Sequence, residues 1–192
     1  MISLRLRSGK AARAALGLAL LSAMACGRAG EPNTAPAGAP DSSSANAAPS
    51  VNLVPHEKLA TLVPVLDGWT REDIRTATVN LPAPVAHATV GYTRGKARID
   101  LEITDTGGHP DYVGSLAKVA GTAFNQTAAN GYLKGTTIGG HPATESWNHV
   151  DRLGDISVLI AGRMVVHATG SEISSIETLR SLVAKVDPAT LK

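Results

Sequence analysis

Three side chains of types that bind metal ions lie in one glycine-containing segment, Asp105-Thr-Gly-Gly-His109-Pro-Asp111. An imidazole and two carboxylates could hold a divalent metal ion, and the two glycines would let a loop turn them inward. Ordinary structural roles explain the same residues. Asp105 could cap the turn after a strand, Asp111 could occupy the first turn of a helix, and His109 would then lie near the N-cap. We expect these structural roles, so Asp105, His109 and Asp111 are only weak candidates for a metal-dependent site.

A second set of ionisable residues, His141, Glu145 and His149, is spaced four residues apart. On one continuous strand all three side chains would point to the same face of the sheet. Four residues of a strand cover about 13 Å, however, whereas each ligand of a zinc ion lies about 2 Å from the metal. This distance excludes a simple chelate. We expect a solvent-exposed strand face here, with Trp147 packing at the edge of the domain.

The common catalytic motifs are missing from the sequence. It contains no H-E-x-x-H, G-x-S-x-G, P-loop or dinucleotide-binding pattern. His167 alternates with Val166 in a predicted strand, so we expect a partly exposed residue rather than a general base. Arg163 falls at a predicted hairpin tip, where a solvated side chain is the default. We therefore predict no catalytic residue, no cofactor and no enzymatic activity.

The only cysteine, Cys26, directly follows a short apolar run, residues 14–25. The preceding residues, 1–13, carry four basic side chains and no acid. A membrane span needs about 20 apolar residues, so this shorter run is typical of a secretory signal peptide. A lone thiol can form neither an internal disulfide nor a cysteine metal cage. The position of Cys26, directly after the apolar run, therefore needs another explanation.

The stretch Leu21-Ser-Ala-Met-Ala25-Cys26 resembles the lipobox of bacterial lipoproteins, in which small residues precede the modified cysteine. It departs from that pattern at Ala23, where leucine is usual. The resemblance implies that residues 1–25 are removed and that Cys26 carries a diacylglycerol and a fatty acid. Buried acyl chains contribute about 0.8 kcal/mol per CH₂, so several chains give a stable membrane anchor. The alternative is an ordinary secretory signal with an incidental cysteine.

The same resemblance implies a place in the cell envelope. Gly27, directly after the cysteine, is not a retention signal for the inner membrane, which implies the outer membrane, facing the periplasm, in a cell with two membranes. Removal of residues 1–25 changes the formal net charge from +2 to −2. No run of Lys and Arg remains and the aromatic residues are scattered, so we do not expect a nucleic-acid partner.

Residues 26–52 are rich in Ala, Pro, Ser and Gly and contain no large apolar side chain before Val51. Such a composition cannot drive collapse, so we expect a disordered tether after the lipidated cysteine. At about 5–6 Å times the square root of its length, this tether spans roughly 30 Å on average. The globular domain could therefore stand clear of a bilayer surface.

Residues 53–192 have the composition and length of one globular domain. In the strand expected at 96–104, the apolar residues Ile99, Leu101 and Ile103 alternate with the charged residues Asp100 and Glu102. This alternation predicts that one face of the strand is buried and the other is solvated. A capping-box pattern, Ser174-Ser-Ile-Glu177, marks the start of the last helix. The expected elements are a short helix at 55–63, a strand near 76–79, a hairpin with arms 88–93 and 96–104, a helix at 110–125, strands at 132–138 and 143–150, a hairpin with arms 156–160 and 164–168, and a helix at 174–187.

Because hairpins dominate this order, the sequence predicts an α+β fold with a mostly antiparallel sheet and helices packed on one face. The domain, from "LDGW" through "AGRMVVHATG" to the last helix, is similar to uncharacterised bacterial envelope lipoprotein domains. It also loosely resembles the PsbP-like fold. The resemblance concerns element order and short apolar strings, and it implies no catalytic residues.

Three functions are compatible with these observations. The leading hypothesis is a membrane-anchored, non-enzymatic binding or accessory module with another envelope protein as its partner. The first alternative is a small metal-dependent hydrolase centred on the 105–111 loop. The second alternative is a carrier of an apolar ligand bound between helix and sheet, which would require a suitable pocket.

Overall fold

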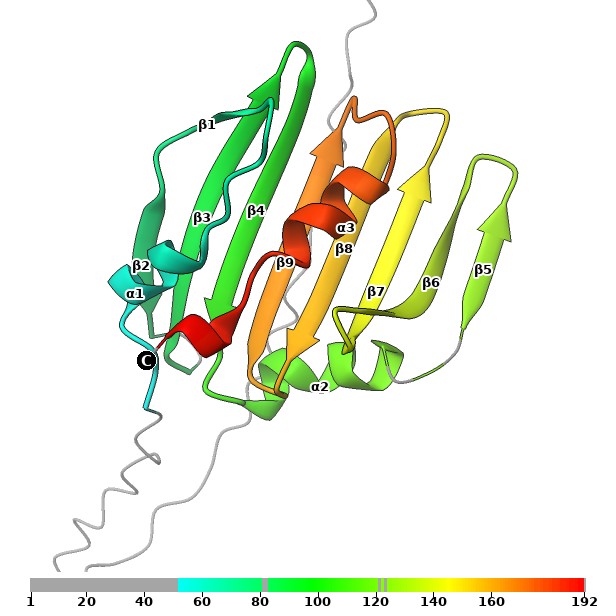
Figure 1. Ribbon diagram of the computed structural model, residues 1–192. Helices are drawn as coiled ribbons and strands as arrows, with labels where there is room; N and C mark the ends of the chain where they lie inside the picture. Colours follow the sequence, from blue (N-terminus) through cyan, green and yellow to red (C-terminus); the bar gives the residue numbers. More distant parts are fainter. Residues whose placement is uncertain (1–51, 81–82, 121, 123, 192) are drawn as a thin grey trace, which may run out of the picture. The chain divides into compact units, whose positions relative to one another are not determined.

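The computed structural model describes residues 52–80, 83–120, 122 and 124–191. The predicted signal peptide, Cys26 and the tether up to Val51 lie outside the described residues. The described part forms a single α+β domain built on a nine-stranded antiparallel sheet (Figure 1). The predicted fold class is therefore confirmed. Every helix in this part of the chain falls short of the length and hydropathy of a membrane-spanning segment.

The strands follow the spatial order β1-β3-β4-β9-β8-β7-β6-β5, and β2 pairs with β3 beside β1. The strands are β1 (Thr70–Arg71), β2 (Arg75–Val79), β3 (Val85–Arg94), β4 (Ala97–Asp105), β5 (Asn125–Ala128), β6 (Gly131–Ile138), β7 (His141–Asn148), β8 (Leu153–Ile160) and β9 (Met164–Ser171). The helices are α1 (His56–Leu59), which continues into the 3₁₀ turn η1 (Ala60–Leu62), α2 (Pro110–Ala120), α3 (Glu177–Val183) and the 3₁₀ turn η2 (Pro188–Thr190).

The β3–β4 hairpin forms as the alternating pattern predicts. Gly95, with φ of 62°, supplies the left-handed backbone that the tight turn requires. Leu101 is buried, whereas Asp100 and Glu102 on the other side of the strand are exposed. The neighbouring strand β9 pairs with β4 so that Ala168 lies opposite Leu101. The core therefore lies on one face of the central strands.

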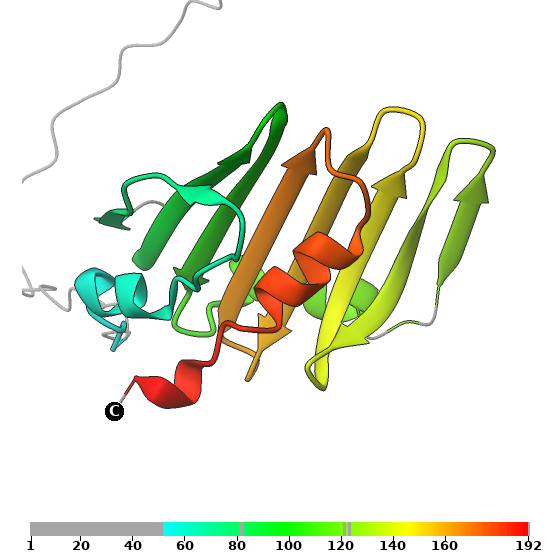
Figure 2. The same ribbon diagram turned by 45° about the horizontal axis from the view of Figure 1, so that its top comes forward.

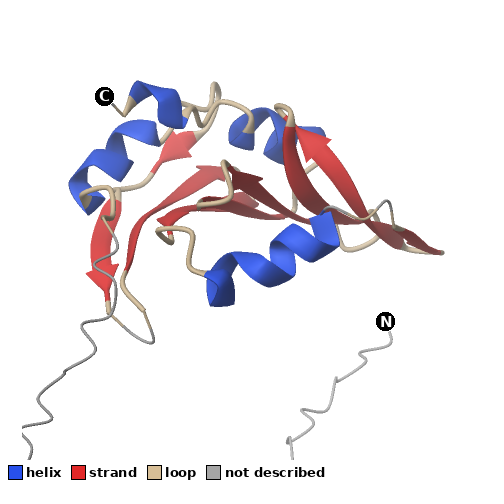
Figure 3. Ribbon diagram, turned by 90° about the horizontal axis from the view of Figure 1, so that it is seen from below, coloured by secondary structure: helices blue, strands red, loops and turns tan. Residues whose placement is uncertain are grey.

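The helices occupy both faces of the sheet, not one face as predicted. The 3₁₀ turn η1 and the helices α1 and α3 cover the core face, here called the α3 face, whereas α2 lies across the opposite face, here called the α2 face (Figures 1 and 3). The alternation in β8 explains this arrangement. Val158 and Ile160 point towards the α3 face, and Leu159 between them is also buried. Leu159 therefore presents an apolar side chain on the opposite face of β8, against which α2 can pack its buried Val113.

Two glycines allow α3 to approach the sheet closely, where it lies across β8 and β9 (Figure 2). A Cβ atom at Gly170 would lie 2.7 Å from Cδ1 of the buried Ile173, and one at Gly154 would lie 2.9 Å from Cδ1 of Ile176. The helix begins at Glu177, whose N–H donates to Ser175 Oγ over 3.2 Å. The predicted capping box therefore does not form, and a single serine contact takes its place.

The region after α2 also differs from the prediction. The helix expected at 110–125 ends at Ala120, and Asn125–Ala128 forms strand β5 instead. Asn125 and Thr127 have low helix propensity, whereas Gln126 is a good helix former. The backbone of all three residues pairs with β6. The tertiary pairing therefore decides a segment that local preference leaves open.

We predict that Gly170→Val will lower the free energy of unfolding by about 1–3 kcal/mol, because the added methyl groups collide with a packed core. Gly114→Ala in α2 is the matched control, since its added Cβ would meet no atom within 4 Å apart from its chain neighbours and the helix's own backbone. This control should stabilise the helix by up to about 1 kcal/mol. Urea denaturation of the two variants measures both effects, and equal stability of Gly170→Val and the unsubstituted chain would contradict the packing described here.

Candidate functional site

The 105–111 loop, the weak candidate for a metal site, does not bring its three ionisable side chains together in the described structure. Asp105 is completely buried, and its two carboxylate oxygens accept hydrogen bonds from the guanidinium of Arg163, each over 2.6 Å. The N–H groups of Val54 and Gly107 donate to the same carboxylate over 2.6 and 2.9 Å. Arg163 also donates to the carbonyl oxygen of Asn52 over 2.5 Å. We call Asp105, Arg163, Asn52 and Val54 the N-terminal clasp, because they fix the start of the described chain to the sheet.

The electrostatics of the clasp follow from these contacts. Burial would raise the pKa of Asp105, but the hydrogen bonds from Arg163, Val54 and Gly107 outweigh burial and hold that pKa below its ordinary value. Asp105 is therefore ionised and its acceptor positions are occupied. The expectation of a solvated Arg163 at the hairpin tip holds only in part, since 40% of its side chain is exposed but its guanidinium binds a buried carboxylate. The turn-capping role of Asp105 is confirmed by its bond to Gly107.

His109 and Asp111 lie away from the buried carboxylate. Nδ1 of His109 is 3.7 Å from Oδ2 of Asp111, and the His109 ring contacts Tyr112 edge-on. Asp111 lies in the first turn of α2 and is largely exposed. Nowhere in the described ranges do three His, Cys, Asp or Glu side chains converge in a way that could hold a metal ion. The loop geometry therefore fits the helix-start role of these residues.

The structure corrects the expectation of a solvated face around Glu145. Glu145 is fully buried on the α3 face, in line with Ala143 and Trp147 on β7. His141 is half-buried at the start of the same strand, and His149 lies in the turn after it. The three ionisable residues therefore do not form one exposed row. The buried position requires polar partners for the Glu145 carboxylate, since an unpaired buried charge is costly.

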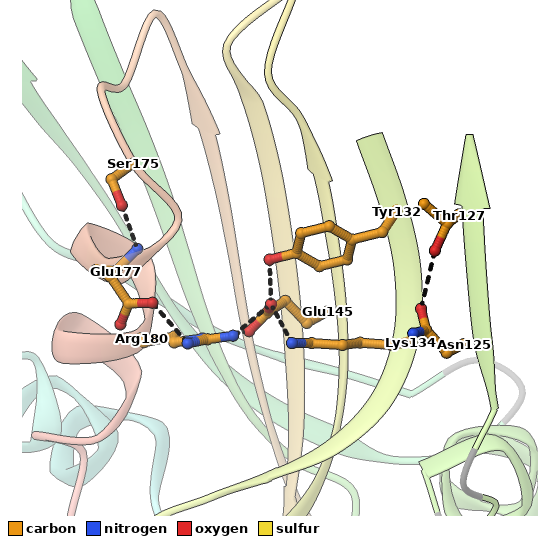
Figure 4. Close-up of polar contacts among 8 residues, drawn as sticks. All are labelled: Asn125, Thr127, Tyr132, Lys134, Glu145, Ser175, Glu177 and Arg180. Carbon is orange, nitrogen blue, oxygen red and sulfur yellow. Dashed lines mark hydrogen bonds and ion pairs between the residues drawn. The ribbon is translucent and has the colours of Figure 1, made fainter. Parts of the chain in front are cut away.

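Three cationic or hydroxyl side chains supply those partners (Figure 4). Arg180 of α3 binds both oxygens of Glu145, through Nε and, over 2.6 Å, through a terminal nitrogen. The hydroxyl of Tyr132 donates to the same carboxylate over 2.5 Å, and Nζ of Lys134 lies 3.4 Å from it. A further ion pair joins Arg180 to Glu177 over 2.6 Å. This cluster, here called the Glu145 cluster, links α3 to strands β6 and β7.

The pKa shifts agree with a cluster that is held ionised. Burial would raise the pKa of Glu145, but hydrogen bonds from Arg180 and Tyr132, with the charge of Lys134, hold it below its ordinary value. Burial, followed by the contact with Glu145, raises the pKa of Tyr132 to about 12. Both oxygens of Glu145 are already acceptors, so the carboxylate is not free to act as a general base. The geometry supports a structural role.

A polar groove of about 530 Å³ lies beside the Glu145 cluster, between α3 and the β6–β7 hairpin. Hydroxyl groups of Thr136, Thr137 and Ser181 line it, together with Lys134 and Arg180. Both cations contact Glu145, and Arg180 also pairs with Glu177, so two carboxylates compensate the two positive charges beside this groove. It therefore offers hydrogen bonds rather than a strong site for an anion.

The α2 face carries a second ionisable set, centred on His167. As predicted, His167 points away from the core and is partly exposed. Its Nε2 lies 2.9 Å from Oδ2 of Asp155. The hydrogen bond to Asp155 raises the pKa of His167, and the charge of Glu102 adds to that effect, although burial opposes it. Ser157 lies opposite His167 in the β8–β9 register, but no hydrogen bond joins these two side chains in the described structure.

A charged groove of about 330 Å³ adjoins His167 on the same face. Arg98 is its centre, and its guanidinium binds Glu72 over 2.5 Å and Asp100 over 2.6 Å. These ion pairs are solvent-exposed and individually weak. Acidic side chains outnumber the arginines of the lining, so the groove is net acidic and its charge favours cationic over anionic ligands. The acidic residues are Glu72, Asp73, Asp100 and Glu102, and the arginines are Arg75 and Arg98.

An apolar groove of about 570 Å³ occupies the other half of the uncovered α2 face, over strands β5 to β8. Leu133 and Leu153 line it with 40% and 47% of their surfaces exposed, and Ala128 and Ser146 also contribute to its lining. The nearby Val150, in the β7–β8 turn, is 66% exposed. Exposed apolar side chains grouped in this way mark interaction surfaces more often than scattered ones do. This groove is the best candidate for a binding site.

Sequence reasoning missed both the buried cluster and the apolar groove. One signal for Glu145 was present, because Ala143, Glu145 and Trp147 alternate with the polar residues of β7. That pattern places the carboxylate on the apolar face. No comparable signal identified Arg180 as its partner, since the two residues are 35 positions apart. The leucines of the groove are isolated in sequence and meet only when β6 and β8 flank β7.

Comparisons with known proteins add no relative: no family model, curated protein or solved structure matches the chain. The lipobox and PsbP-like resemblances therefore stay predictions.

We predict that Arg180→Leu will lower the free energy of unfolding by about 3–5 kcal/mol at pH 7, because it leaves a buried carboxylate without its main partner. In the unsubstituted chain the lowered pKa of Glu145 stabilises the fold above the ordinary carboxyl pKa of about 4.3, and this contribution is lost as the pH falls through the lowered value. In the variant the pKa of Glu145 should rise instead. The penalty should therefore shrink towards about pH 5, as urea denaturation at the two pH values would show.

Glu177→Gln is the control for this experiment, because it removes the exposed partner of the same guanidinium. Glu177→Gln should lower the free energy of unfolding by less than about 1 kcal/mol, and this loss should change little with pH. If both variants lost equal stability, or if the Arg180→Leu penalty did not shrink in acid, the role assigned to Glu145 would be wrong.

Proposed function

We propose that this protein is a bacterial envelope lipoprotein, anchored by acyl chains on Cys26, whose globular domain binds another envelope protein without catalysing a reaction. The observation that carries the binding role is the apolar groove on the α2 face, with its exposed Leu133 and Leu153. In a two-membrane cell the anchor would lie in the outer membrane and the domain would face the periplasm.

Support for the anchor comes from the sequence. A basic start, a short apolar run and small residues before Cys26 form a lipobox-like signal, and the Ala- and Pro-rich segment that follows suits a tether. Two or more acyl chains on one cysteine are sufficient for stable membrane attachment, whereas one chain is not. The anchor thus explains the single cysteine of the chain.

The position of the groove supports binding to a partner away from the anchor. The N-terminal clasp holds Asn52 beside Arg163, in the β8–β9 turn at one end of the sheet. Leu153 is the first residue of β8 and lies at the opposite end of that strand. Eight residues of β-strand cover about 26 Å. The groove is therefore distant from the point where the tether joins the domain.

The engagement of the ionisable groups supports binding rather than catalysis. Asp105 and Glu145 are both saturated with hydrogen-bond donors, as described above. His167 has an orienting partner in Asp155, but a nucleophile–base pair would also need Ser157 within hydrogen-bond reach of the imidazole. The described geometry does not provide that contact.

One observation favours a second function, the carriage of an apolar ligand. The apolar groove has a volume of about 570 Å³, within the range of roughly 300–1,000 Å³ typical of small-molecule sites. A ligand there would lie against the α2 face of the sheet, rather than between α3 and the sheet. The test of the groove described below distinguishes a protein partner from such a ligand.

For the anchor, we predict that cells fed a labelled fatty acid will incorporate it into the unsubstituted chain and not into Cys26→Ser. The unsubstituted chain should fractionate with membranes and release no label on treatment with reducing agent, since the diacylglycerol bond is a thioether. A chain that takes up no label and fractionates as soluble would refute the lipoprotein assignment.

For the groove, we predict that a photo-cross-linking residue at Leu153 will give one discrete protein adduct in intact cells. Val65, which is 67% exposed and lies outside the groove, is the matched control and should give none. Adding Leu133→Glu, which places a charge in the apolar groove, should remove the adduct. Mass spectrometry of the adduct then shows whether the cross-linked molecule is a protein or a small apolar compound.

The outcomes separate the two candidate functions. A different protein joined at Leu153 supports the partner-binding role, and a lipid or other small apolar adduct supports the carrier. Equal labelling at Leu153 and Val65, or an adduct that persists with Leu133→Glu, would mean that the groove is not the binding surface.

A further inference from the structure

Strand β5 ends the nine-stranded sheet, and among the described residues it pairs on one side only, with β6 (Figure 1). All four of its residues, Asn125–Ala128, are exposed. The outer edge of a terminal strand presents unpaired backbone N–H and C=O groups, which can pair with a further strand. The β5 edge is therefore a surface with defined hydrogen-bonding chemistry.

The backbone groups that face outward can be identified from the β5–β6 register. The N–H of Gly135 donates to the carbonyl of Phe124 over 3.0 Å, so Phe124 turns its backbone groups towards β6. Backbone direction alternates along a strand, so Gln126 also faces β6. It follows that Asn125 and Thr127 direct their N–H and C=O groups away from the sheet. Their side chains lie on the α3 face and contact each other over 3.5 Å (Figure 4).

The chemistry of this edge suits a second copy of the same strand. Folded proteins block exposed edges with very short strands, charged residues, proline or bulges. Strand β5 is short, with four residues, but Asn-Gln-Thr-Ala contains no charge and no proline. Two such strands could meet without like-charge repulsion. The opposite edge of the sheet differs, because β2 carries the exposed Arg75 and is flanked by α1, where His56 Nδ1 lies 3.1 Å from Thr78 Oγ1.

We propose that two copies of the chain pair through their β5 strands, antiparallel and about a two-fold axis, and so join their sheets into one. The register that uses both outward residues places Asn125 opposite Thr127 of the second copy, and each such pair exchanges both N–H···O=C bonds. Gln126 then lies opposite Gln126 of the second copy, on the axis. Such an interface is isologous, with the same patch contributed by each chain.

This pairing would combine the apolar grooves of the two copies. Gln126 and Ala128 of β5 line the groove, and Leu133 is the cross-strand partner of Gln126 on the same face. Across the two-fold axis, the groove of one chain therefore meets the groove of the other on the same side of the joined sheet. The dimer would present one longer apolar surface where each copy alone presents a shorter one.

A disulfide test follows from the register. At a non-hydrogen-bonded antiparallel pair the two Cα atoms are about 4.5 Å apart, within the range of about 4.4–6.8 Å that a disulfide accepts. In the full chain carrying Cys26→Ser, Gln126→Cys is the sole cysteine. On mild oxidation of a cell extract it should give a covalent dimer on a non-reducing gel. Thr78→Cys in the same background, on the opposite edge, should not.

Two further substitutions test whether the strand backbone makes the contact. Added to Gln126→Cys, Thr127→Pro removes an outward N–H that β6 does not use, and should lower the dimer fraction about tenfold. Thr127→Ser keeps the N–H and should leave the dimer unchanged. If the proline variant fails to fold, Asn125→Lys with Thr127→Lys provides the same test, because the lysines then lie directly opposite each other in the dimer.

The proposal is overturned if Gln126→Cys cross-links no better than Thr78→Cys, or if the dimer survives both the proline and the double-lysine substitutions. Neither outcome bears on the proposed anchor or on the Leu153 adduct, since this test uses a chain that cannot be acylated and contains no photo-cross-linker. Failure of one proposal is therefore distinguishable from failure of the other.

Discussion

The fold depends on two carboxylates that are buried completely and must each find an arginine from a distant part of the chain. Asp105 ends β4 and binds Arg163, and Glu145 on β7 binds Arg180 of α3. Neither pair can form until the sheet has its final strand order, because the partners are 58 and 35 residues apart. An unpaired buried charge is far more costly than an ordinary packing defect. These two contacts therefore favour one arrangement of strands and helix over alternatives with a similar apolar pattern.

The parts of the fold that could be predicted are those in which local pattern and packing agree. Strand β4 alternates strictly, and Leu101 faces the core as the pattern requires. The β8–β9 hairpin is recognisable from two short apolar strands joined by a suitable turn. Other features depend on contacts that no local pattern encodes. The strand Asn125–Ala128 has little apolar character and forms because β6 offers backbone partners. Glu145 was expected on a solvated face because charge was given more weight than its alternation with Ala143 and Trp147.

Part of the α2 face is uncovered because α2 alone packs on it, whereas α1, η1 and α3 pack on the α3 face. On the α3 face, α1, η1 and α3 cover apolar residues along most of the central strands. Among the α2 residues whose burial is described, one is buried, Val113 at 9% exposure, and the helix covers only the end of the α2 face near Leu159. The remaining surface contains a charged, net acidic half around Arg98 and an apolar half around Leu133. A protein or apolar ligand that contacts this face therefore meets a graded surface, with a polar side that fixes orientation and an apolar side that contributes free energy.

The N-terminal clasp also determines how the domain would respond to mechanical load. A force applied to the chain before Asn52 is transmitted to the domain through Arg163 and Asp105. These residues lie near the ends of strands β9, β8 and β4. If the opposing force acts at the other end of β8, the load runs along these strands. Hydrogen bonds between antiparallel strands then resist in shear and must break together, rather than one after another as in peeling. The position of one arginine at a hairpin tip thus sets the direction in which this sheet is mechanically strongest.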